Sequence, residues 1–169
     1  MRPISERVAR RYSDEKADPV AWDDAEARLA AAEVAWVVTV RPDGRPHATP
    51  VVPATVDGKI YFHTGTEEVK FANLQASPHV LVLAGDTAWD DGLDVAVEGT
   101  AAMVGDDALL RRLAAVLRDR WDGRWRLEIV DGEVISGVPG TDLRFFEVTP
   151  VKAHGHAKGD PYGHTTYRF

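Results

Sequence analysis

The sequence predicts a mainly β protein, a closed or partly open antiparallel β-barrel with flanking helices. Short apolar runs rich in β-branched residues recur along the chain, as in strands. Asp-Gly pairs separate several of these runs, as in hairpin turns. The regular alternation of strands and helices that a doubly wound sheet requires is absent, and so is a glycine-rich nucleotide loop.

Composition limits the possible functions. The 169 residues are 44% apolar with a net charge of −7, which is typical of a globular protein and argues against a nucleic-acid surface or an anionic membrane. The absence of cysteine excludes disulfides, thiolate metal ligands and cysteine nucleophiles. No apolar run reaches the ~20 residues of a membrane span, and the N-terminus lacks the apolar core of a secretory signal. We therefore expect a cytoplasmic enzyme or binding domain.

The N-terminal region divides at residue 18. Residues 1–17 are polar and predict an arm, and residues 18–169 are expected to form one domain. Asp18-Pro19 predicts a helix start, with a side-chain acceptor at the cap and proline in the first turn. Trp22, Ala25, Leu29 and Ala32 then fall on one helical face, which predicts the buried side.

Three strands follow, at residues 35–40, 46–54 and 59–64. The sequence RPDG at 41–44 predicts the first turn, and Asp57-Gly58 predicts the second. Pro50 and Pro53 cannot donate to a ladder. The second strand is therefore expected at an edge, at a bulge, or beside something other than a strand.

The second half of the chain is predicted to contain two helices and three strands. A short helix is predicted at 66–75 with Phe71 and Leu74 inward, and a longer helix at 108–121 is capped by Asp106. Strands are predicted at 80–85, at 93–104 with a bend at Gly99, and at 142–155, which brings the total to six. Residues 122–141 are not assigned, although 127–135 can form a hairpin, and residues after 155 read as a tail.

Three segments resemble a known family. The sequences GRPHATPVVPA, DGKIYFHTGTEEVKFANLQASPHVLVL and DVAVEGTAAMV are similar to the split β-barrel of pyridoxamine 5'-phosphate oxidase-like flavoproteins. The most similar branch is that of flavin- and deazaflavin (F420)-dependent oxidoreductases, and the resemblance extends over about residues 36–169. It implies a six-stranded split β-barrel of the FMN-binding type. It also implies a homodimer that holds F420 or FMN in a groove between its subunits.

The resemblance implies a cofactor site. Thr64 and Lys70 match the strand-end threonine and the phosphate-contacting lysine of the family, with the same spacing. Asn73, in the helix that follows, is expected to orient the loop. Tyr167 and Arg168 in the tail are expected to close the groove from the partner subunit.

The remaining cofactor contacts are expected from residues 49–52, where Thr49, Pro50, Val51 and Val52 would face the ring through backbone groups. Thr49 falls where the oxidases proper have an arginine on the phosphate, and Ala54 where they have a lysine beside the ring. Glu68 and Val69 replace their serine and arginine just before Lys70. Most of the phosphate-binding charge of those oxidases is therefore missing, and Lys70 offers one point charge.

The function implied is hydride transfer between F420 or FMN and a small organic acceptor. The cofactor carries this chemistry, so no side chain is named as catalytic. Two alternatives stay open. The chain can be a non-catalytic protein that binds a cofactor or haem, with His47, His63 or His79 as the axial ligand. It can also be a barrel that has lost its ligand.

The remaining histidines, Trp89 and the serines do not indicate a further functional site. His154 and His156 point to the same side of a strand, with His164 and Asp160 following, but no third ligand lies at a tight spacing and no metal is expected. Trp89 is expected to pack within its loop, the alternative being a wall of the cofactor groove. A serine hydrolase is disfavoured because the chain has no Gly-x-Ser-x-Gly elbow.

Overall fold

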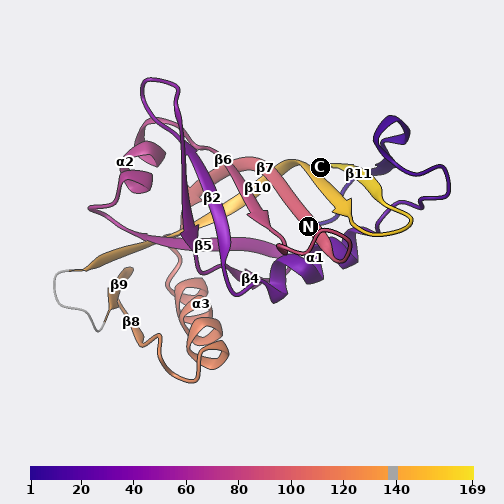
Figure 1. Ribbon diagram of the computed structural model, residues 1–169. Coiled ribbons are helices and arrows are strands. Elements are labelled where there is room, and N and C mark those ends of the chain that lie inside the picture. Colours follow the sequence, from indigo (N-terminus) through magenta and orange to yellow (C-terminus); the bar gives the residue numbers. More distant parts are fainter. Residues whose placement is uncertain (137–140) are drawn as a thin grey trace.

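The computed structural model describes residues 1–136 and 141–169. It is an open antiparallel sheet with helices packed around it, the split-barrel architecture that the sequence predicts (Figure 1). The helices are α1 (Trp22–Ala31), α2 (Val69–Ala76), α3 (Asp107–Arg120) and a short 3-10 helix, η1 (Arg10–Tyr12). The strands are β1 (Ser5–Val8), β2 (Ala35–Val40), β3 (Pro46–Val51), β4 (Ala54–Val56), β5 (Lys59–Gly65), β6 (His79–Ala84), β7 (Leu93–Met103), β8 (Leu127–Val130), β9 (Glu133–Ser136), β10 (Asp142–Ala157) and β11 (Gly163–Arg168).

All six predicted strands are present, but eleven form among the described residues. The predicted strand 46–54 is divided into β3 and β4 by Val52 and Pro53. Its edge position is confirmed, because β3 ends the main path through the sheet and pairs with β2 alone among the described strands.

Four of the additional strands come from segments outside the six predicted strands. The tail forms β11, and β1 in the segment expected as an arm pairs antiparallel with it. The hairpin considered at 127–135 is confirmed as β8 and β9. Asp131 and Gly132 connect these strands with φ values of 49° and 79°, the left-handed backbone of a two-residue hairpin turn. Residues 137–140, within the segment left unassigned, lie outside the described residues.

The predicted start of the first helix at Asp18-Pro19 is wrong. The helix begins at Trp22, and Ala21 at its N-cap makes no side-chain capping bond. The preceding residues are held extended by β11, since the Val20 N–H donates to Thr165 Oγ1 at 2.9 Å and the Tyr167 hydroxyl donates to the Val20 carbonyl at 2.9 Å. A tertiary contact therefore overrides the local capping signal, whereas the predicted buried face of the helix is confirmed.

The other two helices differ in how well their starts were predicted. α3 begins within one residue of the prediction, and Asp106 Oδ1 accepts a hydrogen bond from the Leu109 N–H at 2.7 Å. α2 begins at Val69 instead of Thr66, with Glu68 in extended conformation at its N-cap. The carboxylate of Glu68 turns back to accept from the Gly65 N–H at 2.8 Å, so it does not lie in the first helical turn.

β10 organises the sheet. It pairs with β7 along most of its length, with β5 along its first half and with β11 along its second half. The β7 register shifts between Pro150 and Lys152, which marks a bulge. Gly99, predicted as a bend, lies opposite this bulge, where an added Cβ would lie 2.2 Å from the Thr149 carbonyl oxygen. Only glycine fits this close approach.

Two apolar clusters stabilise this arrangement. The larger one lies between α1, α2 and the strands of the main sheet. The second joins α3 to β4, β5, β9 and the start of β10 through Tyr61, Leu110, Leu113, Leu117 and Phe145. It fixes the β8–β9 hairpin and the segment before it against β5. Across residues 1–136 and 141–169, no helix has the length and apolar character needed to cross a membrane.

Candidate functional site

Two segments that the sequence assigned to a cofactor site meet at one cavity of about 440 Å³. Pro50, Val51 and Val52 line it from the end of β3, and Lys70 lines it from α2. Fold geometry thus brings together residues that are about twenty positions apart in sequence. Among the lining residues that the sequence did not assign to this site are His63 on β5, Leu143 on β10 and Trp125; the others are Val34, Glu68, Ser136 and Thr141.

Lys70 is not an ordinary solvated lysine. Only 5% of the residue is exposed, and its ammonium group pairs with the Glu68 carboxylate. Burial acts to raise the pKa of Glu68, but hydrogen bonds from Lys70 and from the Gly65 N–H outweigh burial and hold this pKa below its usual value. The positive charge at the cavity is therefore already compensated, and an incoming anion competes with Glu68 for Lys70.

His63, which the sequence offered as a possible axial ligand of haem, was not assigned to the Lys70 cavity but lies on its wall. It is 9% exposed, and its ring centroid lies 5.0 Å from that of Trp125 and 5.3 Å from that of Phe145. Burial, helped by the charge of Lys70, lowers the pKa of His63 to about 4. Its Nδ1 atom is buried without a hydrogen-bond partner in the described part of the chain. The available signal was a histidine directly after the apolar residues 60–62 of β5.

Such an unpartnered atom requires an explanation, because leaving a buried polar group unsatisfied costs about 1–3 kcal/mol. Here the atom belongs to a neutral imidazole on a cavity wall, with apolar surface from Val52, Leu143 and Trp125 around it. The arrangement suits a flat ring that offers hydrogen-bonding atoms at its edge and carries a negative group toward Lys70.

The other predicted site residues do not line this cavity. Thr64 is buried and its hydroxyl donates to the Gly65 carbonyl at 3.2 Å. The amide of Asn73 donates to Thr39 Oγ1 at 2.9 Å, so it connects α2 to β2 instead of orienting a loop. Thr49 lies on β3, where its hydroxyl is buried and no described group pairs with it.

The tail residues lie far from Lys70 within the chain. Arg168 is exposed on β11 and pairs with Lys152 in the second half of β10, whereas Leu143 of the cavity lies in the first half of that strand. Tyr167 is buried in its own chain, where it packs edge-on against Trp22. Because it is buried, Tyr167 cannot close a partner's groove as expected; for Arg168 this role stays a prediction.

The remaining histidines are distributed differently from the expectation. His154, His156 and His164 do not form a loose tail: His154 Nδ1 and His164 Nε2 lie 2.8 Å apart, and the rings of His156 and His164 stack at 4.3 Å. Within the described residues, no group of three or more potential ligands has the geometry of a metal site. His47 is partly buried on β3, and His79 is exposed.

Trp89 was expected to pack within its loop, and this expectation is wrong. The residue is 92% exposed. It lines a separate hollow with Tyr162, formed by the loops before β7 and after β10. It therefore forms no wall of the Lys70 cavity.

Known proteins resemble this chain in both sequence and fold. Residues 21–157 match the family model for pyridoxamine 5'-phosphate oxidase. No curated protein sequence matches the chain. A conserved hypothetical protein from Mycobacterium tuberculosis has a similar structure, with 22% identity and a TM-score of 0.67 over 85% of this chain and 89% of that one.

Two further structures are similar. An F420 reductase is 25% identical, with a TM-score of 0.54 over 76% of this chain and 94% of that one. A heme binding protein from Mycobacterium smegmatis is 14% identical, with a TM-score of 0.65 over 89% of this chain and 59% of that one. The likeness to the two mycobacterial proteins shows a shared fold.

Proposed function

The chain belongs to the pyridoxamine 5'-phosphate oxidase family, and on this basis we propose that it is an oxidoreductase that transfers hydride between F420 or FMN and a small organic acceptor. The observation that carries the proposal is the cavity where buried Lys70 and the unpartnered imidazole of His63 lie together. The similarity to an F420 reductase supports the deazaflavin as one of the two cofactors.

The residues present fit such a cofactor. Lys70 would hold its phosphate in place of Glu68, and the partnerless Nδ1 of His63 offers a hydrogen bond to a ring edge. Pro50 to Val52 and Leu143 would cover the apolar ring faces and exclude water. When bound, the cofactor itself supplies the hydride chemistry, so the protein contributes binding, orientation and electrostatics.

The proposed assembly follows from the family. We propose a cytoplasmic homodimer in which the Lys70 cavity faces the interface and Arg168 of the partner subunit completes it. Thr49 and Thr64 would support the site from β3 and β5, although neither lines the cavity within one chain.

Titration of the purified protein with FMN and with F420, followed by fluorescence, tests the proposal. We expect saturable binding of at least one of them, and Lys70→Ala to weaken it by about 1–3 kcal/mol, the scale of one charged hydrogen bond. Lys59→Ala is a matched control, because Lys59 on β5 pairs with Glu147 at 2.7 Å and does not line the cavity. An affinity that Lys70→Ala leaves unchanged contradicts the site assignment.

A second candidate is a carrier that binds a cofactor or haem without turnover. The partnerless imidazole of His63 on the cavity wall favours it, because neutral imidazole is a common axial ligand. Haem titration separates the two candidates. A Soret band that His63→Phe abolishes supports the carrier, whereas oxidation of reduced F420 or FMN in the presence of an acceptor supports the enzyme.

A further inference from the structure

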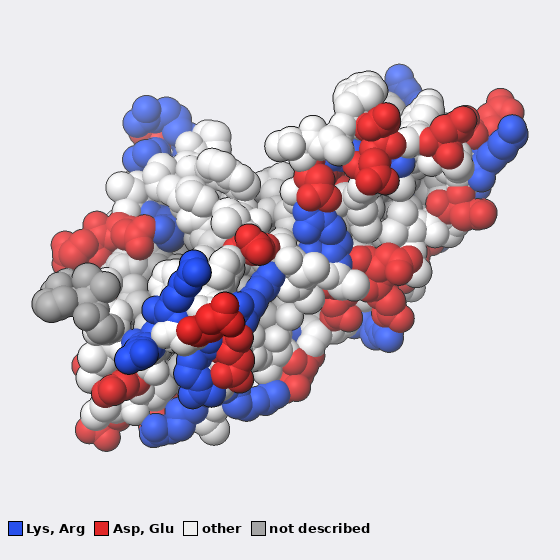
Figure 2. Space-filling model, turned by 60° about the horizontal axis from the view of Figure 1, so that its bottom comes forward, with Lys and Arg blue, Asp and Glu red and all other residues white. Residues whose placement is uncertain are grey.

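Positive charge is concentrated in one segment of this acidic protein. The stretch 111–126 contains six arginines and two aspartates, in a chain whose net charge is −7. Figure 2 shows Lys and Arg side chains gathering on the face that comes forward when the molecule is turned toward the viewer from below, where α3 lies. All the basic residues of the segment are arginines, the side chain best suited to bidentate pairing with carboxylate or phosphate.

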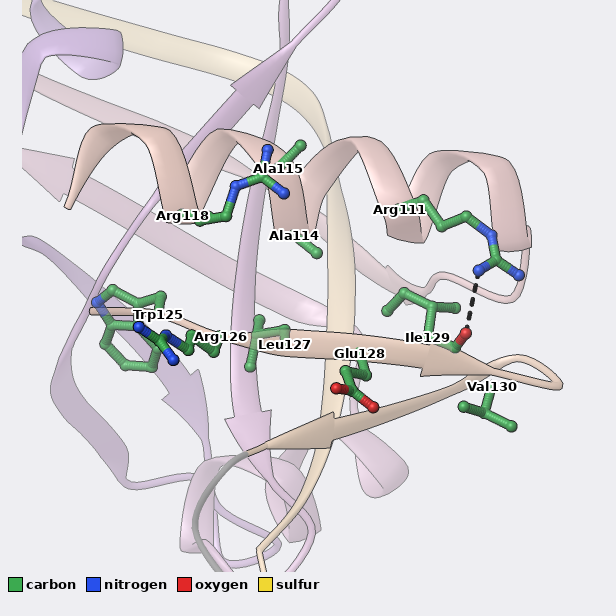
Figure 3. Close-up of a pocket in the computed structure, with 10 residues that line it drawn as sticks. All are labelled: Arg111, Ala114, Ala115, Arg118, Trp125, Arg126, Leu127, Glu128, Ile129 and Val130. Carbon is green, nitrogen blue, oxygen red and sulfur yellow. Dashed lines mark hydrogen bonds between the residues drawn. The ribbon is translucent and has the colours of Figure 1, made fainter. Parts of the chain in front are cut away.

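A groove runs between α3 and β8 along this segment. Arg111, Ala114, Ala115 and Arg118 recur at i, i+3, i+4 and i+7, so they share one face of the helix. The two alanines leave a hollow of about 460 Å³ between the arginines, and β8 forms its other wall (Figure 3). Arg111 and Arg118 are two helical turns apart, about 10 Å along the axis.

Several arginines of the segment have structural roles. Arg112 makes a bidentate pair with Asp57 at 2.8 Å, and Arg120 donates to the carbonyls of Ala31 and Ala32. Arg111 bridges the groove by donating to the Ile129 carbonyl at 3.1 Å (Figure 3). These contacts fix the position of α3, so they do not require a ligand.

Arg118 and Arg126 are not explained in this way. Within the described part of the chain, the one ion pair of Arg118 is with its neighbour Asp119 at 3.0 Å. Both side chains are more than half exposed, so the pair is weak and exchangeable. Arg126 donates only to the Gly123 carbonyl at 3.3 Å, with no acidic partner among the described residues. Glu128 is the one acid among the residues that line the groove, while Arg111 pairs with Asp107 at 3.1 Å from outside the lining. The pairs of Arg111 and Arg118 are solvent-exposed and therefore weak, so a bound anion can replace their carboxylates.

The groove adjoins the Lys70 cavity, because Trp125 lines both. Figure 3 shows Trp125, Arg118 and Arg126 toward the same end of the groove. The charge of Lys70 is compensated by Glu68, so the cavity alone offers little net attraction for an anion. Arg126, which lines the groove together with Trp125, has no acidic partner among the described residues, and Arg118 has only an exposed one.

We propose that the groove between α3 and β8 is a binding site for a small ligand with two or more carboxylate or phosphate groups, held by Arg118 and Arg126. Such a ligand is either a separate polyanion or the anionic extension of a molecule whose ring occupies the Lys70 cavity. The groove site itself does not depend on hydride transfer, and only the second source rests on the proposed function.

Pyrophosphate is the probe. Calorimetric titration is expected to show saturable binding to the wild-type protein, and NMR signals of the Arg118 and Arg126 Nε–H groups are expected to shift in parallel. The double variant Arg118→Gln/Arg126→Gln should weaken binding about tenfold or more, because two charged hydrogen-bond donors are lost. Arg41→Gln/Arg45→Gln, which removes the same charge at the distant β2–β3 turn, should change it less than about twofold.

Absence of saturable pyrophosphate binding, or equal weakening in the two double variants, overturns the inference. Arg41 is partly buried and the other three arginines are exposed. An unchanged thermal unfolding curve verifies that each variant is folded. A failure of the proposed function is a different result: the protein then binds neither F420 nor FMN, but it still binds pyrophosphate. If saturating pyrophosphate weakens F420 binding, the ligand spans both sites; if it does not, the groove takes a separate anion.

Discussion

At the scale of single residues, competition between Glu68 and an incoming anion governs the affinity of the Lys70 cavity. Glu68→Gln keeps an oxygen acceptor for the Gly65 N–H but removes the negative charge that neutralises Lys70. We expect this variant to bind FMN or F420 more tightly, by about 1 kcal/mol. Its effect is thus opposite in sign to that of Lys70→Ala.

Fluorescence titration of Glu68→Gln and Glu67→Gln checks this prediction. Glu67 is the matched control, because it is the adjacent exposed acid, it does not line the cavity and it is not paired with Lys70. Weaker binding by Glu68→Gln, or an equal gain in the control, contradicts the competition.

His63 makes stability depend on pH in a predictable direction. The unfolded chain protonates this histidine near its ordinary pKa of 6.5, whereas the native state resists protonation down to about pH 4. Between these values the unfolded state binds more protons, so the free energy of unfolding falls as the pH falls from 6.5 toward 4. The loss reaches about 3 kcal/mol by pH 4.

Urea unfolding of the wild type and of His63→Phe, measured from pH 7 to pH 4, isolates this contribution. Phenylalanine keeps an aromatic ring between Trp125 and Phe145 but cannot titrate. The stability of the variant should therefore fall less steeply with acidification. Parallel curves for the two proteins would show that His63 is not held neutral by its burial.

At the scale of elements, Asn73 anchors α2 to the sheet. Its hydrogen bond to Thr39 Oγ1 is buried and joins α2 to β2, which fixes the helix that carries Lys70. Asn73→Ala is expected to lower the free energy of unfolding by about 1–3 kcal/mol, because the buried Thr39 hydroxyl loses the hydrogen bond that it accepts from Asn73. Chemical unfolding of Asn73→Ala, Thr39→Val and the double variant measures the coupling, and strict additivity would contradict it.

The elements also show what local sequence can predict. Asp106 capped α3 as expected, and Asp57-Gly58 formed its hairpin turn with left-handed φ values of 51° and 70°, because these signals act within a few residues. The start of α1 was missed, because the bonds from β11 to Val20 come from a segment about 145 residues away. β1 was missed for the same reason, since its pairing partner is at the opposite end of the chain.

The residues of the candidate site also differ in whether local sequence could predict them. Lys70 and residues 50–52 could be placed from family resemblance, because the spacing of a strand and a helix is a local pattern. Trp125 and Leu143 could not, since they reach the cavity only through the packing of α3 and the start of β10. The pairing of Lys70 with Glu68 was also not predicted, because it depends on the extended backbone at the N-cap of α2.

At the scale of the whole molecule, an apolar sheet surface predicts the homodimer. Trp36 on β2 is 51% exposed, and it lies opposite Leu83 in β6, while Val38 lies opposite Leu81. Val151, at the bulge of β10, is 60% exposed and lines a shallow hollow with Val38 and Leu81. Burial of this surface by a second copy would remove these apolar groups from water.

Light scattering coupled to size-exclusion chromatography tests the dimer. The wild type should elute with about twice the chain mass of 18.5 kDa. Trp36→Glu/Val151→Glu should elute as a monomer, whereas Trp89→Glu, at an exposed aromatic residue in the hollow before β7, should remain a dimer. A monomeric wild type would contradict a site shared between subunits.

The central claim is that a flavin-type ring occupies the cavity beside Lys70 and His63. NMR of the histidine ring nitrogens during titration with F420 and with FMN tests it most directly, because Nδ1 of His63 has no partner in the described residues. We predict that the His63 nitrogen signals shift in proportion to the bound fraction of one cofactor, and that Lys70→Ala requires higher ligand concentrations for the same shift. Cofactor binding that leaves the His63 signals unmoved, or no saturable binding of either cofactor, would contradict the claim.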